Sequence, residues 1–119
     1  MSVKKYNGWT NYETWLAKLW MGNDEGSYSY FGDLAQQAYE NAFADATFTK
    51  SERAALDLDD LLKEEHEEAA QNMLEASGCE ASVFSDLLGA ALSEVNWHEI
   101  AVSLLEDLVN EYGEELEEV

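Results

Sequence analysis

The sequence predicts an all-α protein, a compact single-domain bundle of about five helices with an acidic surface. Proline is absent from its 119 residues, and apolar residues recur at helical spacing along most of the chain. Gly, Ser, Asn and Asp separate the periodic stretches, as expected where helices end and begin. A chain of this length can bury its own core. We therefore expect one helical domain over residues 1–119, with a short acidic tail from about residue 113.

The first predicted helix follows Thr10 and Asn11, either of which can cap a helix N-terminus. Its large apolar residues share one stripe, and they are Trp15, Leu16, Leu19 and Trp20 together with Tyr12. Large aromatic residues on one stripe usually anchor a small core, so we expect this stripe and Trp9 to pack inward. The alternative is an exposed recognition surface. Glycines at 22 and 26 suit the turn that follows.

A second helix is predicted from Ser27, as its N-cap, to about Ala46. It turns inward Phe31, Leu34, Ala35, Ala38, Tyr39, Ala42 and Phe43. Residues 47–56 are ambiguous, although Thr49 and Glu52 have capping-box spacing, which favours a short helical turn.

A long third helix is predicted from Asp57 or Asp59 to Ala76, with Gly78 as its stop. The residues that we expect it to bury are Leu58, Leu61, Leu62, Ala69, Met73 and Leu74.

Ser82 can cap a fourth helix. Its apolar residues are Val83, Phe84, Leu87, Leu88, Ala91 and Leu92. The fifth helix has the clearest start, with Asn96 as N-cap, Glu99 as its capping-box partner, and Val95 placed to pack on Ile100. Its continuous apolar stripe consists of Trp97, Ile100, Ala101, Leu104, Leu105, Leu108, Val109 and Tyr112, and Gly113 is expected to end it.

The charge of the chain is its most unusual property. It has 26 acidic and 6 basic residues, a formal net charge of −20. Such a surface repels nucleic acid and anionic membranes and attracts basic proteins. We therefore expect a basic protein partner and no direct binding of nucleic acid or membrane. A single cysteine, Cys79, excludes an internal disulfide and fits a reducing, cytoplasmic location.

No catalytic group or metal site is predicted, and we expect neither a cofactor nor an enzymatic activity. His66 lies within Glu64–Glu68, but it lacks a second histidine one turn away and any Glu-x-x-His pair, so a solvated acidic face is the preferred interpretation. His98 has no Asp, Ser or Cys partner at a diagnostic spacing. Cys79 is a lone thiol without a nucleophile signature.

The acidic residues concentrate in two groups, which are the predicted partner-binding residues. The group on the long helix consists of Asp57, Asp59, Asp60, Glu64, Glu65, Glu67, Glu68 and Glu75. The group at the C-terminal end includes Glu106, Asp107, Glu111, Glu114 and Glu115. Like charges one helical turn apart destabilise a helix by about 0.2–0.5 kcal/mol per pair, so a function is expected to compensate for them. Rows of carboxylates can imitate a phosphate backbone.

Two segments resemble a known family. Gly8-Trp9-Thr10-Asn11-Tyr12-Glu13-Thr14-Trp15, and Glu94-Val95-Asn96-Trp97-His98-Glu99-Ile100-Ala101 with the residues before it from Phe84, are similar to a family of small acidic proteins of phages, plasmids and prokaryotic genomes whose function is unknown. The resemblance implies a mobile-element setting and no particular reaction.

Two hypotheses about function follow. The first is a DNA mimic that inhibits a nucleic-acid-binding defence enzyme of the host, as anti-restriction and anti-CRISPR proteins do. The second is a phage or plasmid accessory protein that binds a partner through its Trp/Tyr-rich N-terminal helix, its acidity being an adaptation to solubility or salt. The sequence leaves the oligomeric state open.

Overall fold

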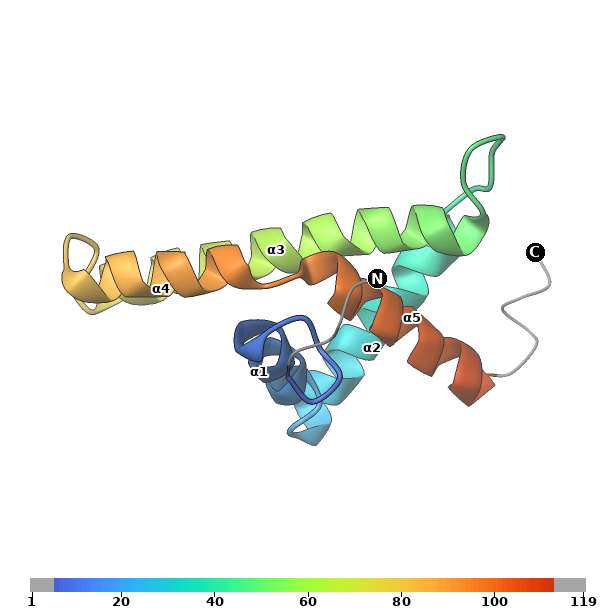
Figure 1. Ribbon diagram of the computed structural model, residues 1–119. Coiled ribbons are helices and arrows are strands. Elements are labelled where there is room, and N and C mark those ends of the chain that lie inside the picture. The colour runs from blue at the N-terminus through green and yellow to red at the C-terminus, as the bar shows by residue number, and fades with distance from the viewer. Residues whose placement is uncertain (1–5, 113–119) are drawn as a thin grey trace.

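A computed structural model describes residues 6–112 of the chain and the side chains of residues 6–108. Five α-helices follow one another in this part: α1 (Tyr12–Met21), α2 (Glu25–Asn41), α3 (Lys50–Ala76), α4 (Val83–Glu94) and α5 (Trp97–Tyr112). No strand occurs between residues 6 and 112. The predicted all-α bundle of about five helices is therefore confirmed (Figure 1). None of these helices has the length and apolarity that crossing a membrane requires.

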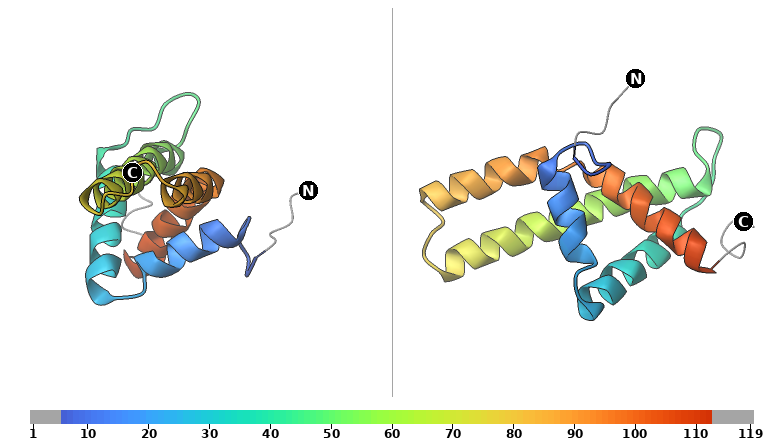
Figure 2. Two further views of the ribbon diagram at one scale, coloured as in Figure 1. Left: turned by 90° about the vertical axis from the view of Figure 1, so that its left-hand side faces the viewer. Right: turned by 60° about the horizontal axis from the view of Figure 1, so that its bottom comes forward.

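The long helix α3 connects two parts of the molecule that differ in packing. Its N-terminal half packs against α2 and α5, and its C-terminal half runs antiparallel to α4, away from the other helices (Figures 1 and 2). We call residues 67–94, the end of α3 with the loop and α4, the arm. Helix α1 lies across the base of the arm and contacts α2, α4 and α5.

The core lies where α2, α3 and α5 meet. Leu58 and Leu62 of α3 and Ile100 of α5 are completely buried there. Ala35, Ala54 and Ala101 are also completely buried at these contacts. Because these side chains are small, they let the helices approach closely. Helix α4, in contrast, contains no buried residue.

Local hydrogen bonds explain where the helices begin. Asn11 caps α1, Ser82 caps α4, and the side chain of Asn96 accepts a hydrogen bond from the Glu99 amide at the start of α5, as predicted. The reciprocal half of the predicted Asn96–Glu99 capping box differs, because the Asn96 amide donates to Thr14 Oγ1. The prediction for α2 was wrong by three positions. Asp24, and not Ser27, is its N-cap, because the Asp24 carboxylate accepts the backbone N–H of Ser27.

Two predicted boundaries between α2 and α3 were also wrong. Helix α2 ends at Asn41 and not near Ala46, since the Asp45 carboxylate accepts the backbone N–H groups of residues 47 and 48 and stabilises a turn there. Phe43 consequently lies in the loop and is 81% exposed, although it was expected to be buried. The predicted capping box of Thr49 and Glu52 forms, but it opens α3 itself and not a separate short turn.

The structure also corrects the predicted burial of apolar residues in α3 and α4. Leu58, Leu62 and Leu74 are buried as expected, whereas Leu61, Ala69 and Met73 of the same helix are exposed. Val83, Phe84 and Leu87 of α4 are exposed as well. The reason is that each helix of the arm has one helical neighbour along most of its length, which covers only one of its sides. Gly78 follows the C-terminal end of α3 and has the expected left-handed backbone conformation, with φ 73°.

Candidate binding surfaces

The two segments that carry the family resemblance meet at the start of α5. The Thr10 amide donates a hydrogen bond to Glu99 Oε1 at 3.2 Å, and Asn11 Nδ2 donates to the Glu94 carbonyl at 2.7 Å. The Asn96 amide donates to Thr14 Oγ1 at 2.9 Å. These bonds join residues 82 to 89 positions apart, so they fix α1 and the loop before it to the junction of α4 and α5.

The same contacts set which side of α1 packs inward. Thr14 is completely buried, and its hydroxyl also donates to Asn11 Oδ1 at 2.6 Å. Ala17 packs on the core and Met21 is buried, so the inward side of α1 is formed by residues spaced three and four apart. A helix turns about 100° per residue, which places Tyr12 and Leu19 on roughly the opposite side and Trp20 about a quarter turn from the inward side.

The predicted inward packing of the first-helix stripe was therefore wrong. Trp20 is 61% exposed, Tyr12 46% and Leu19 43%. Trp15 and Leu16 are half-buried, and of the residues predicted to pack inward here only Trp9, in the preceding loop, packs against the core.

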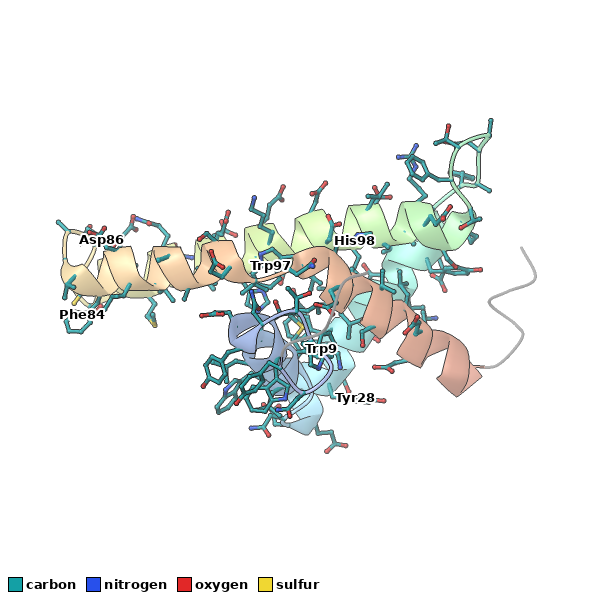
Figure 3. All side chains as sticks on the ribbon, viewed as in Figure 1. Trp9, Tyr28, Phe84, Asp86, Trp97 and His98 are labelled. Carbon is teal, nitrogen blue, oxygen red and sulfur yellow. The ribbon has the colours of Figure 1, made fainter. Side chains whose placement is uncertain are left out.

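The exposed side chains of α1 form a continuous surface. The Tyr6 ring lies 5.1 Å from that of Tyr12 and 5.0 Å from that of Trp15, and the Tyr12 and Trp15 rings are 5.7 Å apart. Leu19 and Trp20 continue this surface one helical turn further on. We call these five residues the aromatic face. Figure 3 shows ring-bearing side chains gathered on the side of α1 that is turned away from α5.

His98 has a partner that no local sequence spacing indicates. Its Nδ1 lies 2.8 Å from Asp59 Oδ2, a contact that joins α5 to α3 across 39 positions. Burial raises the pKa of Asp59 above its ordinary value, while the hydrogen bond from His98 opposes the rise. No serine, threonine or cysteine of residues 6–108 forms a hydrogen bond with the His98 ring. The pair links α5 to α3.

His98 also lines a shallow groove of about 500 Å³ beside the start of α5. The groove is bounded by Gly8, Trp9, Thr10, Asn96, His98, Glu99, Val102, Ser103 and Glu106. Most of these residues belong to the two segments of the family resemblance, so the groove marks where those segments meet. Its open shape and its hydrogen-bonded walls favour a structural junction over a small-molecule site.

The structure corrects the predicted environment of His66. Its Nδ1 lies 2.8 Å from the Leu62 carbonyl, and its ring contacts those of Phe31 and Trp97 at centroid distances of 5.8 and 4.8 Å. The ring therefore packs among aromatic residues and does not lie on a solvated acidic face. Within the described part of the chain, no three His, Cys, Asp or Glu side chains are grouped to hold a metal ion.

The predicted acidic residues of α3 divide into two sets. One set is exposed on one side of the helix, and it consists of Asp57, Asp60, Glu64, Glu67, Glu68 and Glu75. We call this set the acidic row. Asp59 lies apart with His98, and Glu65 accepts a hydrogen bond from the Tyr30 hydroxyl at 2.7 Å.

Of the predicted acidic residues of the C-terminal end, the two whose side chains are described do not join this row. Glu106 and Asp107 are exposed on α5, and Asp107 lies 3.7 Å from Lys18 Nζ of α1. The side chains of Glu111, Glu114 and Glu115 lie outside the described residues.

Comparison with known proteins gives one result. The model of a family described as "Family of unknown function (DUF7249)" matches residues 2–119. The chain belongs to this family. No curated protein and no solved structure matches it. The resemblance to a family of unknown function is thus confirmed, and what the DUF7249 fold does has to be argued from its surfaces.

Proposed function

We propose that this protein is a non-catalytic module that binds a partner protein through the aromatic face of α1. One observation carries the proposal: α1 buries a threonine completely and leaves Trp20 61% exposed. Burying an exposed tryptophan is favourable, so a stable helix that presents one beside Tyr12 and Leu19 marks an interaction surface. Trp and Tyr are also the residue types that most often dominate the energy of protein interfaces.

The support of α1 makes this surface suitable for binding. The buried Thr14 and the Asn11 cap hold the helix in one rotation, and the contacts among Tyr6, Tyr12 and Trp15 restrict the rings. Side chains that are already ordered lose less conformational entropy when a partner binds.

The net charge of −20 supplies the second property of the partner. A strongly negative molecule accelerates its encounter with basic proteins. We therefore propose a partner with an apolar pocket in a basic surface. The resemblance to proteins of phages and plasmids supports an accessory protein of a mobile element, acting in the cytoplasm of its host.

Capture from a lysate of the source organism tests this proposal. Wild-type protein and the Trp20→Ala variant are compared, with Phe43→Ala as matched control because Phe43 is even more exposed and lies outside the aromatic face. We expect Trp20→Ala to weaken binding of the captured protein by about 30-fold or more, the loss of a hot-spot residue. Equal capture by the wild-type protein and both variants contradicts the proposal.

The acidic row favours a second candidate, a DNA mimic that inhibits a nucleic-acid-binding defence protein, in the manner of anti-restriction or anti-CRISPR proteins. Asp57 and Glu75 are the ends of the row, and they are 18 positions apart, which corresponds to a rise of about 27 Å along the helix. This length corresponds to about eight base-pair steps of DNA at about 3.4 Å each. The exposed carboxylates can therefore occupy a groove that normally holds a phosphate backbone.

The two candidates differ in their response to salt and DNA. Capture through the acidic row is released by salt and competed by duplex DNA, and it weakens when Asp60→Asn and Glu64→Gln are combined. Capture through the aromatic face loses only the contribution of the charge attraction when salt is raised, and it persists in that double variant. Capture that is indifferent to salt and DNA therefore rules out the mimic, and capture that is indifferent to Trp20→Ala rules out the aromatic face.

A further inference from the structure

The apolar stripe of α3 continues beyond the core that it helps to form. Leu58 and Leu62 are completely buried against the other helices. Ala69 and Met73 follow at helical spacing on the same side of α3, but they lie in the arm and are exposed. The stripe thus changes from buried to exposed where α2 and α5 no longer cover it.

Helix α4 adds its own exposed apolar residues to the same side of the arm. Leu74 is buried on the side of α3 that meets α4. Both helices are right-handed and they run antiparallel, so the residues next to their contact, Met73 of α3 and Phe84 of α4, lie on the same side of the pair. Met73, Val83, Phe84 and Leu87 are each between 58% and 62% exposed. We call these four residues, together with the exposed Ala69 and Ala76, the arm face.

The arm face lacks the charge that is abundant elsewhere. None of its six residues is ionisable in a chain that carries 26 acidic side chains. Glu75 follows Met73 by two positions, which places it about 200° around the helix. Figure 3 shows Phe84 and Asp86 on opposite sides of the arm. Glu94, seven positions after Leu87 and so on the same side of α4, is an acidic residue at the α5 end of the arm. Beyond it, toward the loop at 77–82, the arm separates an apolar side from an acidic side.

The size of the arm face is sufficient for a specific contact. At these exposures its four large side chains leave on the order of 100 Å² each in water, so together they expose about 400 Å², within the range of the largest patch on a monomer. Two such faces with their alanines bury about 1,000 Å² when they meet, which is the lower bound for a stable interface.

We infer that a second copy of this chain covers the arm face, so that two arms pack into a four-helix contact about a two-fold axis. A symmetric contact pairs one patch with its own copy, and an uncharged apolar patch complements itself. Two copies of net charge −20 repel each other overall, and they repel least where the surface in contact holds no carboxylate. A basic partner, in contrast, is attracted to the acidic side of the arm.

Sedimentation equilibrium of the full chain, from micromolar to millimolar concentration and at low and high salt, tests this inference. We expect a monomer–dimer equilibrium that tightens as salt rises, because salt screens the repulsion between copies. Phe84→Ser combined with Leu87→Ser is expected to weaken dimerisation by about 30-fold or more. The matched control is Phe43→Ser, an exposed phenylalanine outside the arm, which leaves the dimer unchanged.

Circular dichroism establishes whether the variants fold. If the Phe84→Ser and Leu87→Ser double variant of α4 does not fold, Met73→Glu disrupts the arm face from α3. A wild-type chain that stays monomeric at high salt overturns the inference, as does a dimer that the folded arm variants leave intact or that salt dissociates. The inference does not rest on the proposed partner binding. Trp20→Ala is expected to leave the dimer intact, so the two proposals can fail separately.

Discussion

Replacing Thr14 by valine tests the contact that fixes the rotation of α1. Valine has nearly the shape of threonine but lacks the hydroxyl, which donates to Asn11 Oδ1 at 2.6 Å and accepts the Asn96 N–H at 2.9 Å. Each bond contributes about 1 kcal/mol net to stability, and leaving the part-buried Asn96 N–H unpaired adds up to about 1 kcal/mol. We expect Thr14→Val to lower the free energy of unfolding by about 2–3 kcal/mol.

Urea unfolding followed by circular dichroism measures this change, and an unchanged slope shows that the compactness of the two states is unaltered. Thr14→Ser is the matched control, because it keeps the hydroxyl and loses one buried methyl group at a cost of about 1 kcal/mol. The valine variant is therefore expected to be the less stable of the two. The opposite order would show that apolar packing, and not the two hydrogen bonds, holds α1 in place.

Three further predictions concern charge, capping and the core. Backbone N–H groups of residues 48 and 47 hold the pKa of Asp45 below 3.8, so its contribution to stability is complete above that value and is lost as pH falls through the lowered folded pKa. Burial raises the pKa of Asp59 above 3.8, so its contribution to stability has the opposite pH dependence: it is present at low pH and is lost as pH rises through the folded pKa. Carboxyl NMR titration should show both pKa shifts. An Asp59 that titrates below 3.8 would refute the assigned burial. Thr49→Ala removes the capping box of α3 and should lower stability by about 1 kcal/mol, with faster hydrogen exchange confined to the first turn; a loss of protection throughout α3 would contradict a local role. Ile100→Ala, at a completely buried site, should lower the free energy of unfolding by about 2–5 kcal/mol, and a loss below about 1 kcal/mol would mean that this site is not core.

The sequence predicted helix ends best where a short-range hydrogen bond decides them. The residue types at 10–11 and at Ser82 indicate N-caps, and the structure selects Asn11 over Thr10 and confirms Ser82. The Thr49–Glu52 spacing of three residues predicts a capping box, which forms. The error at α2 has the same origin, because Asp24 and Ser27 can both cap and only the carboxylate makes the bond. Local chemistry of this kind is legible in a single sequence.

Burial could not be predicted in the same way, because it depends on which neighbours a helix has. The large aromatic and aliphatic residues of α1 form the stripe that predicts its packed side. Thr14 decides otherwise, since one of its hydrogen-bond partners, Asn96, lies 82 positions away. The small residues Thr14 and Ala17 at i and i+3, followed by Met21, were the only signal in the sequence.

The candidate site residues show the same division. The acidic row follows from carboxylates that fall on one side of a single helix, a pattern visible in the sequence. Asp59 and Glu65 do not belong to that row, because they form hydrogen bonds with His98 and Tyr30, which lie 39 and 35 positions away in the sequence. The Asp59–His98 pair was missed for the same reason, since neither residue has a local partner that marks it.

The central claim is that the free chain keeps the aromatic face of α1 in water, ready for a partner. Broadening of the tryptophan indole N–H signals by a soluble paramagnetic agent measures this directly by NMR. We predict that the Trp20 signal broadens strongly while that of Trp97, which is 7% exposed, is protected. Addition of the captured partner should then protect Trp20 as well. A Trp20 signal that is as protected as that of Trp97 in the free protein would contradict the account.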